Sequence, residues 1–407
     1  MKLKLHWQVL IAMVLGAAFG LTIGEVPWVG KVADIFMRLL RMVIVPLIFT
    51  SIVSGVAGIA DGRSLGRLGA KTIVYYMVTS LLAILIGLTL TNLIRPGDGI
   101  EAATEQSVSP DTIQTPDSLA DIIQRMIPVN PVQAAAEFDI LALIFFSICF
   151  GATISAMRGS SGDLLRSIFD ALFEATMKLT GYVILLLPIG VFALIATAIG
   201  RMGLGVFEQV GKYMITIAAG LSIHFFLVLP LLFWLLTRRN PIDHYRAMSS
   251  AMAMAFSTSS SSATLPVTMA AIQDNAGVSR KVSSFVLPMG ATINMDGTAL
   301  YECAGALFIA QALGVELSIG QQAVVVLTAL LASIGAAGIP SAGLVMIFIV
   351  LEAVGLTDPA AYALVGLMLG IDRPLDMYRT LVNITSDSVG AAVIAHSEGE
   401  TLTYDRG

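Results

Sequence analysis

Long runs of apolar residues, separated by short polar connections, recur along the whole chain. Six runs are long enough to cross a bilayer, because a transmembrane helix needs about 20 mainly apolar residues. They are the ranges of about 7–24, 32–60, 72–94, 140–157, 166–200 and 212–237. The pattern predicts an all-α polytopic membrane protein, and no convincing cleavage site follows the first run, so we expect an uncleaved first helix.

Two later apolar segments are interrupted by runs of small residues that are unfavourable in helices. The interruption is 257–266 in the segment 251–271, and 333–343 in the segment 323–354. Each contains a proline, so helical hydrogen bonding ends there and backbone groups are freed. We call the interruption 257–266 the serine tip and the interruption 333–343 the second tip. Either of them alone could be a kinked span or an oligoserine loop. Two such segments together indicate the inverted repeats of a transporter, with eight membrane spans and two re-entrant hairpins.

The last apolar region, from about 360 to 395, carries many polar and ionisable side chains. Each ionisable group at the bilayer centre costs roughly 2.5–3.5 kcal/mol on insertion scales, so several in one span are unfavourable against lipid. Their spacing of three or four residues places them on one helix face. They are Asp372, Asp376, Arg379, Asn383 and Asp387. The pattern predicts one wet or protein-packed functional stripe; the alternative is a set of salt bridges that only hold helices together.

Charged residues indicate the orientation of the chain and exclude several function classes. Basic residues such as Lys4, Arg63 and Arg238 lie on alternate connections, whereas the connection of about 96–139 is acidic. The positive-inside rule therefore places both termini in the cytoplasm of a cell (inner or plasma) membrane and the acidic loop outside. No basic patch supports nucleic-acid binding. The His residues form no evident metal cluster and the serine run has no paired base, so we expect no enzyme and no cofactor.

The polar residues suggest which ligands the site would take. Carboxylate and amide oxygens suit a hard monovalent cation, and Asn294, Asp296, Asn383 and Asp387 provide them. The guanidinium of Arg379 suits a carboxylate, which it can bind through two parallel hydrogen bonds. Asp376, one turn earlier, suits an ammonium group, so the pair fits an acidic amino acid. An ion channel is the alternative from another class, but no repeated pore signature supports it.

These motifs resemble the dicarboxylate/amino acid:cation symporter family, which is also called the glutamate transporter family. The resemblance covers essentially the full length and is densest over 250–395. The matching motifs are 259–266, 294–298, 338–343 and the residues Asp376, Arg379, Thr380, Asn383 and Asp387. The family implies a homotrimer in the lipid bilayer, in which a scaffold holds a transport domain that crosses the membrane like an elevator.

The resemblance also divides the chain. The scaffold would comprise 1–71 (spans 1 and 2) and 95–211 (spans 4 and 5 with the external acidic loop). The transport domain would comprise 72–94 (span 3) and 212–407. The latter would contain span 6, hairpin 1 at about 245–275, span 7 at about 284–314, hairpin 2 at about 321–354 and span 8 at about 358–395.

The family's substrate roles carry over by position in the motifs. Asp376 would hold the ammonium group of the substrate, and Arg379 with Thr298 its side-chain carboxylate. Asn383 and the serine tip would hold the main-chain carboxylate, while the second tip would close over the substrate as a gate. The implied substrate-binding residues are Ser260, Ser261, Ser262, Thr298, Gly338, Asp376, Arg379, Thr380 and Asn383.

Three sodium sites are implied by the same resemblance. The first would comprise Gly290, Asn294, Asn383 and Asp387. The second would comprise Thr292, Ser333, Ile334 and Ala336, largely through backbone carbonyls. The third would comprise Tyr76, Thr79, Ser80, Asn294 and Asp296. The resemblance therefore implies that sodium is the coupling ion.

Some positions depart from the family pattern. Some archaeal members carry Arg where this chain has Ser259, and animal members carry Arg where it has Met377. We expect Arg373 to supply the same charge near Asp372, Asp376 or Asp387, although Pro374 beside it could kink the helix. Glu302 lies where animal members have a Glu linked to proton coupling; it could instead only pair with an Arg such as Arg373.

The combined prediction is a sodium-coupled symporter that moves glutamate and aspartate into the cell, alone or with a proton. A proton-coupled glutamate or C4-dicarboxylate symporter is the alternative within the class. Asp376 argues against pure dicarboxylate transport, because an ammonium-binding Asp has no use for succinate. An anion-conducting channel activity is the alternative from a different class.

Overall fold

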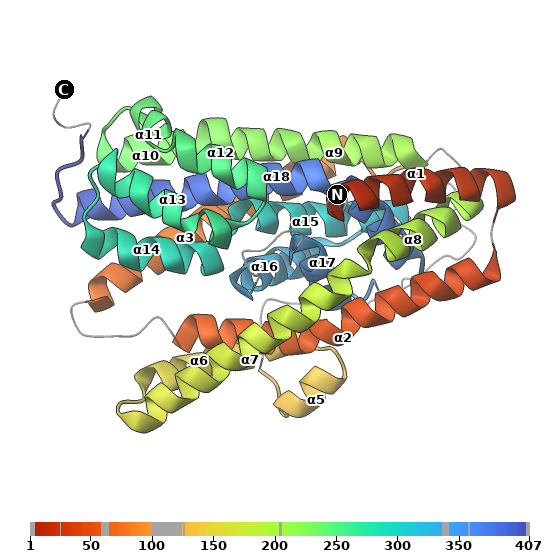
Figure 1. Ribbon diagram of the computed structural model, residues 1–407, viewed down its shortest axis with the longest axis horizontal. Coiled ribbons are helices and arrows are strands. Elements are labelled where there is room, and N and C mark those ends of the chain that lie inside the picture. The colour runs from red at the N-terminus through yellow and green to blue at the C-terminus, as the bar shows by residue number, and fades with distance from the viewer. Residues whose placement is uncertain are drawn as a thin grey trace.

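The computed structural model describes residues 5–24, 26–57, 65–99, 124, 127–202, 206–335, 342–356 and 359–403. These residues form helices joined by short connections, and no strand occurs among them (Figure 1). Two helical stretches, Arg67–Ile94 and Glu208–Thr237, are long and apolar enough to cross a membrane. The bent pair Ser160–Val183 and Leu187–Thr197 brings the number to three if it forms one span.

The first group of helices builds one side of the molecule. It consists of α1 (Leu5–Ile23), α2 (Pro27–Ala57), α5 (Pro131–Ala136), α6 (Ile140–Ala156), α7 (Ser160–Leu185) and α8 (Leu187–Met202). Helix α1 packs along α8, and α2 packs against α6, α7 and α8. The expected span 166–200 is divided at Leu186, with a bend of 53°. Pro188 explains the division, because proline cannot donate the backbone hydrogen bond that a continuous helix needs there.

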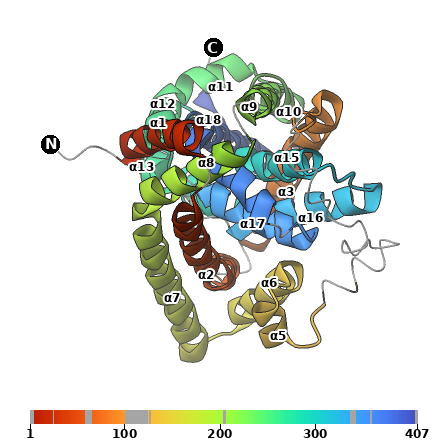
Figure 2. The same ribbon diagram turned by 90° about the vertical axis from the view of Figure 1, so that its right-hand side faces the viewer.

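The second group packs around two long buried helices, α15 and α18. It consists of α3 (Leu65–Ile94), α9 (Val206–Ile223), η3 (His224–Val228), α10 (Leu229–Thr237), α11 (Pro241–Ala247), α12 (Ser249–Thr258), α13 (Ser261–Asp274), α14 (Arg280–Ile293), α15 (Asp296–Ala312), α16 (Ile319–Gly335), α17 (Ala342–Ala353) and α18 (Pro359–Ser397). Helix α15 packs against α3, α9, α16, α17 and α18 (Figure 2). Almost all of its side chains are buried.

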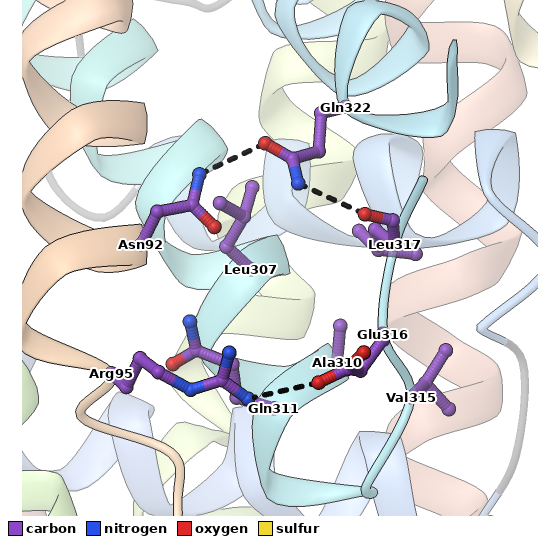
Figure 3. Close-up of a pocket in the computed structure, with 9 residues that line it drawn as sticks. All are labelled: Asn92, Arg95, Leu307, Ala310, Gln311, Val315, Glu316, Leu317 and Gln322. Atoms are coloured by element: carbon purple, nitrogen blue, oxygen red, sulfur yellow. Dashed lines mark hydrogen bonds and ion pairs between the residues drawn. The ribbon is translucent and has the colours of Figure 1, made fainter. Parts of the chain in front are cut away.

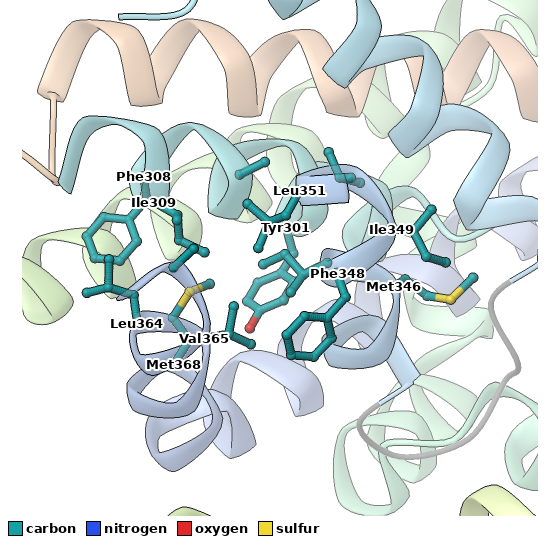
Figure 4. Packing of buried hydrophobic residues seen from close by; sticks show 14 of the residues in the cluster. Tyr301, Phe308, Ile309, Met346, Phe348, Ile349, Leu351, Leu364, Val365 and Met368 are labelled. Carbon is teal, nitrogen blue, oxygen red and sulfur yellow. The ribbon is translucent and has the colours of Figure 1, made fainter. Parts of the chain in front are cut away.

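Large apolar side chains fill the space between α15, α17 and α18 (Figure 4). Tyr301 and Phe308 come from α15, Phe348 from α17 and Met368 from α18, and each of the four is buried. In a bilayer, close van der Waals packing of such side chains, rather than their exclusion from water, holds the helices together. Gly305 lets α17 approach, because a Cβ there would lie 2.3 Å from Ile347 Cδ1. The polar residues on α15 and α18 are therefore held by a rigid apolar frame.

The first of the two interruptions expected from the sequence occurs in the structure. Helix α12 ends at Thr258, Ser259 adopts a left-handed conformation (φ 51°), and α13 begins at Ser261. Ser260 caps α13, since its Oγ accepts a hydrogen bond from the Ala263 amide at 3.2 Å, the usual role of a serine at a helix N-terminus. In the second segment, α16 ends at Gly335 and α17 begins at Ala342. The tip between them lies outside the described residues.

The structure shows how the backbone runs at two positions of the expected spans. The expected span 284–314 is divided at Asn294 and Met295 into α14 and α15. These two residues have extended or irregular backbone angles, so the polar motif itself forms the break. Conversely, α18 is assigned as one helix through Pro374. The side chain of Pro374 is exposed, where the helix can bend towards solvent or lipid to accommodate the ring.

An ionic cluster ties the end of α18 to the start of α3. The Glu398 carboxylate accepts hydrogen bonds from Lys71 Nζ at 2.6 Å and from Arg67 Nη2 at 2.6 Å. Hydrogen bonds from Lys71 and then Arg67 lower the pKa of the Glu398 carboxyl to about 2. Glu398 is therefore ionised over the whole physiological range.

Replacing Glu398 with Gln should destabilise the protein at neutral pH and make no difference in strong acid. A carboxyl whose pKa is lowered by folding contributes stability above its unfolded pKa and loses it as the pH falls through its folded pKa. The difference between wild type and Glu398→Gln should therefore shrink between about pH 4.5 and about pH 2. Melting temperatures of both proteins across this range test the prediction; a pH-independent difference would contradict it.

Candidate functional site

Asn294 is the centre of a buried polar cluster at the break between α14 and α15. Its Oδ1 accepts from Thr79 Oγ1 at 3.4 Å and from Ser80 Oγ at 3.5 Å, both on α3. Its Nδ2 donates to Ser386 Oγ at 3.0 Å and to Asp387 Oδ1 at 2.9 Å, both on α18. One carboxamide thus joins three helices in the interior of the protein.

Asp296, two residues later, belongs to the same cluster. Its Oδ1 accepts from Ser80 Oγ at 2.7 Å, and its Oδ2 lies 3.0 Å from His224 Nε2. Both Asp296 and His224 are fully buried. Because a carboxyl group is costly to bury without hydrogen bonds, these two neighbours stabilise it by contacting both of its oxygens.

Gly290 and Tyr76 complete this cluster on the side of α14. The Tyr76 hydroxyl donates to the Val286 carbonyl at 2.8 Å. A Cβ on Gly290 would lie 2.5 Å from both Asp387 Oδ1 and Tyr76 Oη. The space that glycine leaves open is lined by oxygen atoms, which are the ligands that Na⁺ finds at broken helices in transporters. The residues present therefore fit a monovalent cation.

The structure thus brings together the residues predicted for the third sodium site and most of those for the first. Asn383 is the exception, because its Oδ1 accepts from the Gly297 amide at 2.8 Å and its Nδ2 donates to Thr298 Oγ1 at 3.2 Å. It therefore lies on the side of the cluster that faces the predicted substrate site. A Cβ on Gly297 would lie 2.9 Å from the Arg379 backbone, which shows how closely α15 and α18 pack here.

The second predicted sodium site is less complete. Thr292 on α14 and Ser333 on α16 lie on helices that pack against each other. Each hydroxyl donates to a carbonyl of its own helix, Thr292 to Met289 at 3.0 Å and Ser333 to Leu330 at 2.8 Å. Ile334 is partly buried beside them, and Ala336 lies outside the described residues. A shared set of ligands at this position stays a prediction.

Arg379 is the centre of the predicted substrate site, and only 1% of it is exposed. Its Nη2 donates to Asp376 Oδ1 at 2.9 Å and lies 3.1 Å from the Asp372 carboxylate. Its guanidinium carbon lies 3.8 Å from the centre of the Tyr301 ring, a cation–π contact. Nε and Nη1 have no hydrogen-bond partner in the described part of the chain. Two donors therefore remain to bind an anion.

Thr298 and Gly343 lie next to these free donors. A Cβ on Gly343 would lie 3.1 Å from Arg379 Nη1 and 3.1 Å from Thr298 Cγ2. Gly343 is near the start of α17, so this helix start lies against the guanidinium. Thr380 is held on the same face, because its Oγ1 donates to the Asp376 carbonyl at 2.8 Å. The structure therefore brings Thr298, Asp376, Arg379, Thr380 and Asn383 together.

The serine tip lies on the hairpin of α12 and α13, which packs against α18. Ser260 and Ser261 are buried, whereas Ser262 is exposed. Their predicted contact with a substrate carboxylate stays a prediction. Gly338, predicted in the second tip, lies outside the described residues.

Arg373 and Glu302 were the two positions with open interpretations. Arg373 Nη1 lies 3.5 Å from Asp376 Oδ2, so Arg373 lies close to one of the three aspartates, and its part in the site stays a prediction. Asp376 thus lies between two guanidinium groups. Glu302 is fully buried, and neither of its carboxyl oxygens has a hydrogen-bond partner among the residues described. No hydrogen bond or ion pair joins Glu302 to Arg373 among these residues, and whether Glu302 carries a proton or only interacts with an Arg stays open.

The sequence analysis missed His224 and Tyr301. An ionisable residue inside an apolar span is a functional candidate by default, and this rule could have identified His224 in the span 212–237. Tyr301 is one turn after Thr298, but nothing in its spacing predicts that its ring would stack on Arg379.

A separate pocket of about 140 Å³ lies where α3 and α15 end (Figure 3). Asn92 Nδ2 donates to Gln322 Oε1 at 2.9 Å across it, and Arg95 Nη2 lies 3.5 Å from Glu316 Oε1. Its polar groups pair with one another, unlike the free donors of Arg379. None of the predicted site residues lines this pocket.

The chain is similar to known transporters over nearly its whole length. The profile of the sodium:dicarboxylate symporter family matches residues 5–397. Excitatory amino acid transporter 3 of Mus musculus is 37% identical, over 96% of this chain and 86% of that protein. An excitatory amino acid transporter of Caenorhabditis elegans is 36% identical, over 97% of this chain and 88% of that protein. Excitatory amino acid transporter 4 of Mus musculus is 36% identical, over 89% of this chain and 76% of that protein. The chain therefore belongs to the sodium:dicarboxylate symporter family of membrane transporters.

Proposed function

We propose that this protein is a sodium-coupled symporter that brings glutamate and aspartate into the cell. The observation that carries the proposal is the buried guanidinium of Arg379, whose Nε and Nη1 have no hydrogen-bond partner among the described residues. A buried Arg with unused donors is a strong site for a carboxylate, because charge-assisted hydrogen bonds are strengthened away from water. The relatives named as excitatory amino acid transporters support the same class of substrate.

Asp376 sets the rest of the substrate specificity. Its carboxylate lies beside Arg379, at 2.9 Å from Nη2, and offers a partner for an ammonium group. Succinate carries the same two carboxylates as aspartate but no ammonium group, so it would leave Asp376 and Asp372 without that partner in a buried site, which is unfavourable. The site is therefore suited to an acidic amino acid rather than to succinate.

Sodium binds, in this proposal, in the cluster around Asn294 and Asp387. Asn383 connects the two sites, because it contacts both the start of α15 and Thr298. A cation that fixes the break between α14 and α15 also fixes Asn383 and Thr298 for the substrate. Each ligand then raises the affinity for the other, as thermodynamic linkage requires.

The transport cycle follows from the helix arrangement. We assign eight spans and two re-entrant hairpins, with α12–α13 and α16–α17 as the hairpins, and both termini in the cytoplasm. In this assignment α3 and α9–α18 move as the transport domain, and the remaining helices form the scaffold of a homotrimer. The second hairpin closes over Arg379, since Gly343 already lies against its guanidinium. A half-loaded domain would carry uncompensated buried charge across the bilayer, which is penalised.

Equilibrium binding to the purified protein tests the proposed function. L-aspartate, L-glutamate and succinate are titrated in sodium and in choline, at two pH values. We expect strong binding of the two amino acids only in sodium, and no binding of succinate. Binding that is independent of sodium and follows pH would replace sodium by protons, and binding of succinate alone would refute the role of Asp376.

Glu302 is the proposed site of an accompanying proton. Its carboxyl group is enclosed and has no hydrogen-bond partner in the described part of the protein, so an anion there would be costly. Replacing Glu302 with Gln should abolish proton uptake and retain sodium-dependent aspartate binding, because glutamine mimics the neutral acid. A pH indicator inside proteoliposomes measures the uptake, and proton entry that persists in the variant would exclude this role.

A further inference from the structure

His224 lies in the interior at an unusual point of the backbone. It opens η3, a short π-helical turn between α9 and α10, and its side chain is completely buried. Helix η3 packs against α3 and α18, the two helices that provide the hydroxyls and carboxylate of the Asn294 cluster. A π-helical turn widens the helix locally and often occurs at functional positions. Here it places the imidazole against the start of α15.

The contacts of the imidazole define what it does to Asp296. Nε2 lies 3.0 Å from Asp296 Oδ2, and Nδ1 has no hydrogen-bond partner in the part of the chain that the structure describes. A neutral imidazole with its proton on Nε2 satisfies this arrangement, since the bare Nδ1 is then only an acceptor. The opposite tautomer would bury an unpaired N–H and place two acceptors against each other, which is unfavourable.

Asp296 is thereby fixed in one orientation. Oδ2 accepts from His224, while Oδ1 accepts from Ser80 Oγ at 2.7 Å on the side of Asn294. Without the imidazole, the carboxylate could rotate about its Cβ–Cγ bond, and Oδ1 would no longer be held among the hydroxyl and amide oxygens of the cluster. Partners outside the ligand set that orient a ligand typically change cation affinity by 10- to 100-fold when they are removed.

We propose that His224 is a positioning residue for the sodium site at Asp296: its Nε2–H holds the carboxylate so that Oδ1 faces the cation. The proposal rests on the proposed sodium-coupled function. It assigns His224 no contact with the substrate or the cation.

Two substitutions separate positioning from packing. In His224→Gln the amide nitrogen can take the place of Nε2, whereas in His224→Asn it reaches only the place of Nδ1. Asp296→Asn removes the carboxylate and gives the response of a protein without this site. Melting temperature is measured for each purified protein as sodium replaces choline at constant ionic strength, because a ligand that binds the folded state raises it according to its affinity.

We expect His224→Asn to raise the sodium concentration at half effect by about 10- to 100-fold, approaching Asp296→Asn. His224→Gln should keep a nearly wild-type response. His244 is a buried histidine whose Nε2 lies 3.0 Å from Ser388 Oγ. The substitutions His244→Asn and His244→Gln should change the melting temperature without changing the sodium concentration at half effect.

An unchanged sodium response in His224→Asn would overturn the positioning role, as would equal loss in His224→Gln. If wild type itself shows no stabilisation by sodium, the proposed sodium-coupled function fails instead. If only Asp296→Asn changes the response, sodium binding holds and His224 has no part in it.

Discussion

Replacing Arg379 with Ala should abolish binding of aspartate and glutamate while the protein remains able to bind sodium. Removing one partner of a buried, hydrogen-bonded charge pair costs about 2–5 kcal/mol, so the affinity should fall by roughly 30- to 4,000-fold. The space left by the guanidinium should accept a small neutral amino acid such as serine, whose ammonium group still meets Asp376. Binding titrations in sodium measure both effects.

Loss of folding has to be separated from loss of recognition in this variant. Arg379 also pairs with Asp372 and Asp376, so its removal lowers stability as well. Arg238→Ala is a matched control, because Arg238 also stacks on an aromatic ring, that of Trp234 at 5.3 Å, but is exposed. If sodium still raises the melting temperature of Arg379→Ala, the variant is folded, and its loss of aspartate binding is a loss of recognition. Aspartate affinity within threefold of wild type would refute the role of Arg379.

Adding one methyl group at Gly290 should remove the sodium response. The Cβ would lie 2.5 Å from Asp387 Oδ1 and Tyr76 Oη, a distance that real Cβ atoms do not occupy. The carboxylate or the hydroxyl must therefore move out of the cluster, and we expect the apparent sodium affinity to fall at least roughly tenfold, the lower end of effects for displaced metal-site partners. Aspartate binding should weaken with it, because the two sites are linked.

Gly181→Ala is the control for the effect of replacing any glycine within a helix by alanine. Gly181 lies in α7 and a Cβ there would meet no atom within 4 Å, so alanine should leave the sodium response unchanged. Alanine is favoured over glycine inside a helix by up to about 1 kcal/mol. Melting temperature against sodium concentration compares the two variants, and a normal sodium response in Gly290→Ala would show that the cation binds elsewhere.

The sequence predicted the fold where the pattern is strong. Apolar runs of membrane-spanning length located most helices, and the small-residue interruption at 257–266 located the break after Thr258. The division at Asn294 was missed because a polar motif within an apolar run has the same hydropathy signature whether the helix continues or stops. The bend at Leu186 depends on Pro188, a single residue that a window average cannot resolve.

In the candidate site, contacts within one helix could be predicted from the sequence, whereas most contacts between helices could not. Residues of α18 share a face because helical periodicity is local, so their proximity could be predicted from spacing alone. The contacts that join Tyr76, Asn294 and Asp387 come from three helices far apart in the chain, and family resemblance rather than spacing brought them together. The stacking of Tyr301 on Arg379 and the π-helical turn at His224 depend on packing, which no sequence pattern encodes.

Uptake of labelled aspartate into proteoliposomes tests sodium-coupled symport most directly. Vesicles that contain the purified protein are prepared in potassium buffer and diluted into sodium or choline medium at the same pH on both sides. We predict that aspartate accumulates inside above its external concentration only with an inward sodium gradient, and that a sodium ionophore abolishes the accumulation. Equal accumulation in choline, or accumulation that needs a proton gradient without sodium, would contradict sodium coupling.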